Sequence, residues 1–139
     1  MAYKTEVGIF EVVRGFETAT IPREKWRHAE HLTVALFYLV HHDFEFAANK
    51  MRNGILHYLK IIGVDLEKEN PYHETITLFW MRMVSSYLSS KNKNSIVELT
   101  NGLLETCSDK DLPLKFYSRE LLFSDNARKE FVQPDLREF

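Results

Sequence analysis

The segment DFEFAANKMRNGILHYLKIIG, residues 43–63, carries the clearest structural pattern in the chain. Its apolar residues recur every three or four positions and form one stripe, which comprises Phe44, Ala47, Ala48, Met51, Ile55, Tyr58, Leu59 and Ile62. This spacing predicts an amphipathic helix with one face in a core. Asp43 suits the N-cap of this helix, and Gly63 suits the position just after its end.

Similar spacing on both sides of this segment predicts an all-α protein, because no stretch alternates cleanly as a half-buried strand would. Further helices are expected after Thr5, from Pro22 to the histidines at 41–42, from Pro71 with Asn70 as cap, and from Ser95. The C-terminal end predicts one or two short helices. Connections are short, so we expect a compact up-and-down bundle of about five helices with a short helical C-terminal tail.

Length and composition limit the classes of function. A chain of 139 residues fits a single domain. The 18 basic and 20 acidic residues show no basic stripe, which argues against a nucleic-acid partner. The longest apolar run, 32–40, is shorter than the roughly 20 residues of a membrane span. With Cys107 as the only cysteine and no signal-peptide pattern, we expect a cytoplasmic protein. Apolar positions such as Phe46 and Leu56 are compatible with a homodimer.

Four of the five histidine and acidic candidates fall in two short clusters. His28 and His31 are three residues apart, so on a helix their Cβ atoms lie about 5–6 Å apart on one face. His73 and Glu74 stand where a later helix is expected to begin. If consecutive helices alternate in direction, the second and fourth begin at the same end of the bundle. We therefore expect these side chains to meet there, together with Glu17 at the end of the first helix.

One interpretation of this cluster is a metal site. Glu17, His28, His31 and His73 offer neutral nitrogen and anionic oxygen ligands of the kind that bind Zn, Fe or Mn. Helical bundles often hold such sites in their cores. The spacing matches no recognised metal motif, since the chain has no HExxH sequence.

A second interpretation is an acid–base site without metal. His73 and Glu74 would act as general base and orienting group, because burial and a neighbouring carboxylate shift a histidine pKa toward the working range. Tyr72, Tyr117 and Arg119 would then bind a small polar or anionic substrate, the arginine through its bidentate fork.

Two further interpretations involve no catalysis. The polar cluster fits a module that binds a small anion or a partner helix. It also fits a purely architectural role, in which the histidines satisfy backbone groups of the tail. Glu74 in the first turn of a helix is favoured by the helix dipole alone.

Four segments also carry a family resemblance: WRHAEHL at 26–32, YHETIT at 72–77, YSRELLFS at 117–124 and ARKEFVQPDL at 127–136. With them the chain resembles a family of small bacterial all-helical proteins. The resemblance implies that these segments belong together in one structure. It implies no particular reaction, cofactor or substrate.

Overall fold

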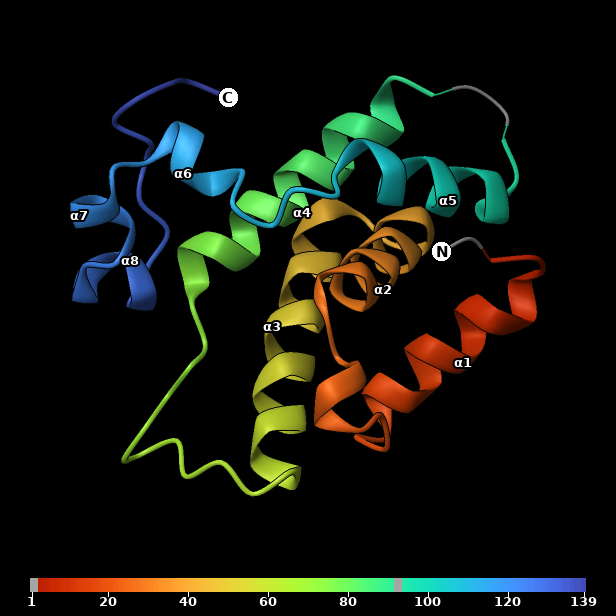
Figure 1. Cartoon of the computed structure of the whole chain (residues 1–139), viewed down its shortest axis with the longest axis horizontal. Coiled ribbons are helices and arrows are strands. Elements are labelled where there is room, and N and C mark those ends of the chain that lie inside the picture. Colours follow the sequence, from red (N-terminus) through yellow and green to blue (C-terminus); the bar gives the residue numbers. More distant parts are fainter. Residues whose placement is uncertain (1–2, 92–93) are drawn as a thin grey trace.

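The computed structural model describes residues 3–91 and 94–139, and every regular element in this part of the chain is helical (Figure 1). The elements are α1 (Glu6–Glu17), η1 (Arg23–Lys25), α2 (His28–His41), α3 (Phe44–Ile61), α4 (Glu74–Ser89), α5 (Ile96–Thr106), α6 (Pro113–Phe116), α7 (Arg119–Leu122) and α8 (Asp125–Lys129). The all-α prediction is confirmed. Part of the predicted break between the fourth and fifth helices, residues 92–93, lies outside the described residues.

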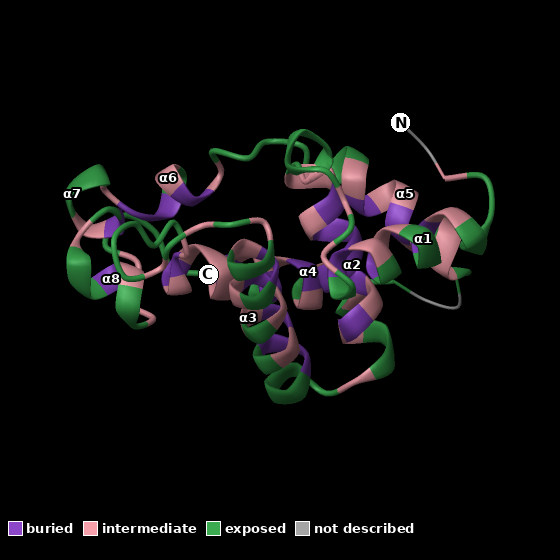
Figure 2. Cartoon of the chain, turned by 90° about the horizontal axis from the view of Figure 1, so that it is seen from below, coloured by how far each residue is buried: buried purple, intermediate pink, exposed green. Residues whose placement is uncertain are grey.

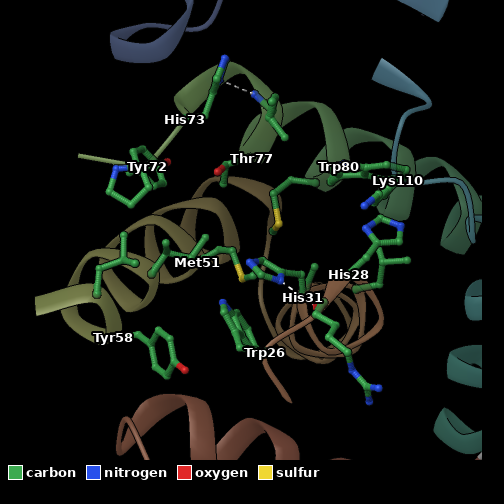
Figure 3. A pocket seen from close by; sticks show the side chains of 18 of the residues that line it. Trp26, His28, His31, Met51, Tyr58, Tyr72, His73, Thr77, Trp80 and Lys110 are labelled. Carbon is green, nitrogen blue, oxygen red and sulfur yellow. Dashed lines mark hydrogen bonds between the residues drawn. The ribbon is translucent and has the colours of Figure 1, made fainter. Parts of the chain in front are cut away.

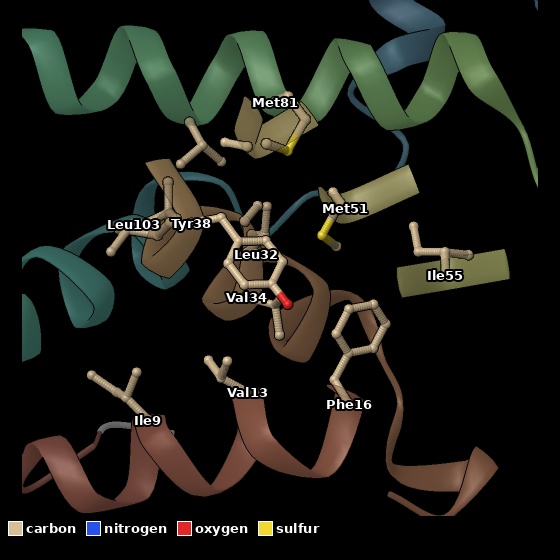
Figure 4. Close-up of a cluster of buried hydrophobic side chains, with 14 of the residues drawn as sticks. Ile9, Val13, Phe16, Leu32, Val34, Tyr38, Met51, Ile55, Met81 and Leu103 are labelled. Carbon is tan, nitrogen blue, oxygen red and sulfur yellow. The ribbon is translucent and has the colours of Figure 1, made fainter. Parts of the chain in front are cut away.

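Helix α2 lies at the centre of the core and packs against α1, α3, α4 and α5. It buries residues on most of its faces, namely Glu30, Leu32, Thr33, Val34, Ala35, Leu36 and Tyr38. A helix that is apolar almost all round is one that other elements surround. Figure 4 shows α1 and α4 running across the view with α2 seen near its axis between them. In Figure 2 the buried residues gather where α2 and α4 meet, and the outer turns of α3 are exposed.

The second predicted helix begins later than expected. Pro22 precedes only the short 3-10 turn η1, and the backbone of Trp26 and Arg27 is not helical. The Trp26 ring stacks on Phe16 of α1, with ring centroids 4.5 Å apart. This tertiary contact holds the chain out of a continuous helix, so α2 begins at His28.

The fourth predicted helix also begins later, and its cap is a different residue. Asn70 does not cap a helix: its side-chain oxygen accepts a hydrogen bond from the Tyr72 amide at 3.0 Å. Pro71 disfavours helical backbone at the residue before it. The N-cap is His73, whose Nδ1 accepts from the Ile76 amide at 3.1 Å.

The C-terminal tail folds into α6, α7 and α8, one more helix than the upper limit of the prediction. A second apolar cluster joins this tail to α4, with Phe79, Phe116, Tyr117 and Leu122 at its centre. The extended end returns to it, because the Leu136 amide donates to the Phe116 carbonyl at 2.9 Å.

Two expectations about surfaces can be compared with the structure. Within the described residues, no helix has both the length and the apolar character to cross a bilayer. Phe46 is 54% exposed, as expected, whereas Leu56 is partly buried and offers less exposed apolar surface than expected.

Candidate functional site

A cavity of about 510 Å³ lies between α2, α3 and α4 (Figure 3). Its volume falls in the range of roughly 300–1,000 Å³ that is typical of small-molecule sites. Its aliphatic and thioether lining comprises Leu32, Ala35, Met51, Ile55, Leu59, Ile62, Ile76 and Met81. Its remaining lining comprises Arg23, Trp26, Arg27, His28, His31, Tyr58, Pro71, Tyr72, His73, Thr77, Trp80 and Lys110. Four of the predicted site residues therefore border one cavity, three of them histidines.

His31 lines this cavity, and among the described residues only one of its two ring nitrogens has a hydrogen-bond partner. Its Nδ1 donates to the Arg27 carbonyl at 2.9 Å, which assigns the proton to Nδ1 and leaves a lone pair on Nε2. The imidazole lies against Trp26, with ring centroids 4.0 Å apart. Burial lowers the pKa of His31 to about 4, and neighbouring His28 lowers it further in the same direction. His31 is therefore a neutral hydrogen-bond acceptor near neutral pH.

His28 links two helices at one end of the cavity. Its Nε2 donates to the Cys107 carbonyl, at the end of α5, at 2.8 Å. Its ring packs edge-on against Trp80, with centroids 4.6 Å apart. Trp80 lies two turns, about 10 Å, into α4. We expected the starts of α2 and α4 to lie side by side, but α2 crosses α4 and its start lies next to Trp80. The cavity nevertheless brings the histidines of the two helices together.

His73 has no free nitrogen. Its Nδ1 caps α4, and its Nε2 donates to the Leu122 carbonyl in the tail at 2.6 Å. The side chain is buried, and this burial lowers the pKa of His73 below its ordinary value. In Figure 3 the ring lies at the edge of the cavity and points away from Trp26 and His31. This geometry gives His73 a role in fixing the helix start and the tail.

Glu74 turns away from the cavity toward α3. Its carboxylate accepts from Arg52 Nε at 2.9 Å and also from Arg52 Nη2 and the Tyr72 hydroxyl. Burial alone would raise the pKa of Glu74, but these hydrogen bonds lower it below its ordinary value. His73 and Glu74 suggested acid–base chemistry, but their polar atoms already have hydrogen-bond partners: the start of α4 and the tail for His73, and mainly Arg52 of α3 for Glu74.

Three other predicted residues lie elsewhere. Glu17 accepts a hydrogen bond from the Tyr38 hydroxyl at 2.7 Å and lines a separate groove with it. Tyr117 is buried in the second apolar cluster and donates to the Val132 carbonyl at 2.6 Å. Arg119 is exposed at the start of α7. The expectation that these residues join the histidines is wrong, because Glu17 lines another groove and the tail packs against α4, with no described residue after Lys110 in the cavity lining.

Metal ligands are not grouped in this arrangement. Among the described residues, no three His, Cys, Asp or Glu side chains are placed to share one ion. Glu17 lines another groove, and His73 has both nitrogens engaged, so His28 and His31 alone remain of the four predicted ligands.

The charge of the cavity differs from that of the chain. The protein carries a net charge of -2, but the cavity lining contains Arg23, Arg27 and Lys110 and no acidic residue. Arg27 is paired with the buried Glu30 at 3.0 Å. In the part of the chain that the structure describes, Arg23 and Lys110 form no ion pair, so their charges remain available at the cavity.

Several lining residues were not predicted as site residues. Tyr58 was predicted only as part of the apolar stripe of α3, Trp26 and Trp80 were not singled out, and Lys110 lies in the connection after α5. The one available signal was the position of Trp26 two residues before His28, which places its ring next to the histidine pair.

Comparison with protein families, with curated proteins and with solved structures finds no match to this chain. The class of protein is described by its fold and its site. It is an all-α protein with an apolar cavity beside its central helix, basic residues in the cavity lining, and a neutral histidine on the cavity wall.

Proposed function

We propose that this protein binds a small organic anion with an apolar body in the cavity between α2, α3 and α4. The observation that supports this function is the contrast between an apolar wall and an exclusively basic set of charged lining residues in an acidic chain. Apolar walls with a few placed polar groups are typical of ligand pockets. A charge of one sign attracts a ligand of the other.

The same geometry supports ligand binding over the two catalytic interpretations. An acid–base pair would need a free nitrogen on His73 and a free carboxylate on Glu74, and both are engaged. A metal site would need at least one more ligand beside His28 and His31. Binding needs only the volume, the apolar wall and the positive charge.

Tryptophan fluorescence provides a direct assay, because the chain has two tryptophans and both line the cavity. Titration with octanoate should change the emission of Trp26 and Trp80 in a saturable way. The uncharged methyl ester of octanoate should bind more weakly, since it leaves Arg23 and Lys110 without a counter-charge. Binding should also weaken as the salt concentration rises.

A matched pair of variants tests the role of charge. Lys110→Met should weaken octanoate binding by roughly threefold, the effect of one exposed charge pair. Lys115→Met removes another exposed lysine, outside the cavity, and should leave binding unchanged. Equal binding of acid and ester, or equal effects of the two variants, would contradict the proposal. Elemental analysis of protein purified without a histidine tag tests the competing metal hypothesis, which a stoichiometric ion would favour.

A further inference from the structure

The inner wall of the cavity carries a hydrogen-bond donor and an acceptor side by side. In the described part of the chain, no hydrogen bond uses the indole Nε1–H of Trp26 or the Nε2 lone pair of His31. Neither atom is fully buried: the buried side-chain atom without a partner in the described residues is Thr100 Oγ1, not one of these two nitrogens. Both residues line the cavity, so a ligand there can reach them. Figure 3 shows the nitrogen-bearing edge of Trp26 beside the His31 ring and Met51.

Both rings are held in place by the protein itself. Trp26 stacks on Phe16 with ring centroids 4.5 Å apart, and it also contacts the tilted His31 ring, with centroids 4.0 Å apart. The His31 tautomer is set by its bond to the Arg27 carbonyl. The donor and the acceptor are therefore preorganised, which lowers the cost of binding a complementary group.

A carboxylate does not match this pair. It only accepts hydrogen bonds, so it would satisfy Trp26 but face the lone pair of His31. A hydroxyl group matches both, because one oxygen accepts from the indole N–H while its proton is donated to Nε2. The acidic end of a ligand belongs instead near Arg23 or Lys110.

We infer that the ligand carries, besides its acidic group, a hydroxyl group that accepts a hydrogen bond from the Trp26 Nε1–H and donates one to the His31 Nε2. This inference rests on the proposed function and names the ligand class: a hydroxylated apolar acid. At about 510 Å³ the cavity lies within the range of roughly 300–1,000 Å³ that is typical of small-molecule sites. Hydroxylated derivatives of octanoate and phenylpropionate are small molecules of this class.

Calorimetric titration with two matched pairs of probes tests the inference. The pairs are octanoate with ω-hydroxyoctanoate, and phenylpropionate with para-hydroxyphenylpropionate. We expect the hydroxylated member of at least one pair to bind about tenfold more tightly, as two modest hydrogen bonds provide. Equal binding within both pairs would overturn the inference and leave the proposed function intact. No binding of any probe would overturn both.

Two variants then locate the effect. His31→Phe keeps a ring against Trp26 but removes the acceptor, and Trp26→Phe keeps an aromatic ring but removes the donor. Each should abolish the preference for the hydroxylated probe, measured within each variant as the ratio of the two dissociation constants of a matched pair. A preference that survives in both folded variants would overturn the inference. The comparison on the unmodified protein needs neither variant, so it decides even if one fails to fold.

Discussion

Replacement of His73 by alanine should destabilise the protein strongly, because this one imidazole joins the start of α4 to the C-terminal tail. The variant loses the cap on the Ile76 amide, which costs about 1 kcal/mol. It also leaves the Leu122 carbonyl without its imidazole partner, which costs about 1–3 kcal/mol. We therefore expect the free energy of unfolding to fall by about 2–4 kcal/mol in urea denaturation. The melting temperature should fall by roughly 5–15 °C.

A second substitution separates the two contributions. Asparagine is among the best N-cap residues but is too short to reach Leu122, so His73→Asn should recover about 1 kcal/mol relative to the alanine variant. His57→Ala, an exposed position of α3, is the control and should change stability by less than about 0.5 kcal/mol. The reasoning fails if His73→Ala is as mild as this control. It also fails if His73→Asn abolishes octanoate binding while stability is unchanged, since that would give His73 a direct role in the site.

Two further predictions concern the tail and the response to acid. Thr75→Val removes a buried hydroxyl that donates to the Ala127 and Glu130 carbonyls at 2.6 and 2.9 Å. The substitution should lower the free energy of unfolding by about 1–3 kcal/mol and speed proteolysis of the tail. Unchanged cleavage of the tail would contradict this. Burial lowers the pKa of His31 from 6.5 to about 4, so its contribution is fully present above pH 6.5 and is lost as the pH falls toward 4, by up to about 3 kcal/mol. His31→Phe should flatten this part of the stability profile, and an equally steep profile would refute the assignment.

Much of the fold could be predicted from apolar periodicity and capping residues. Asp43 caps α3 by accepting from the Phe46 amide at 2.8 Å, and Ser95 caps α5, because these side chains act on their own helix within three residues. The start of α2 could not be predicted in this way. It depends on the stacking of Trp26 on Phe16, a contact between separate segments that no local pattern encodes.

The start of α4 shows how a local signal can mislead. Asn followed by Pro resembles a helix start, but the Asn70 side chain makes a turn with the Tyr72 amide instead. The cap then falls to His73, a residue type that rarely competes with asparagine for this role. It succeeds here because its second nitrogen gains the Leu122 carbonyl, so the local and the long-range bond support each other.

The candidate site illustrates a general difference between the position of a histidine and its chemistry. Helical spacing alone was enough to place His28 and His31 on one face, and both line the same cavity as His73. What each ring can do depends on its partners, which are backbone carbonyls from Arg27, Cys107 and Leu122. Those carbonyls lie 4, 79 and 49 residues away in the chain, so only the shortest of these contacts follows from helical geometry. His73 has both nitrogens committed, whereas among the described residues no partner is found for the His31 Nε2 lone pair or the neighbouring indole N–H of Trp26. The proposed recognition chemistry therefore involves the first cluster, and the second cluster supports the structure.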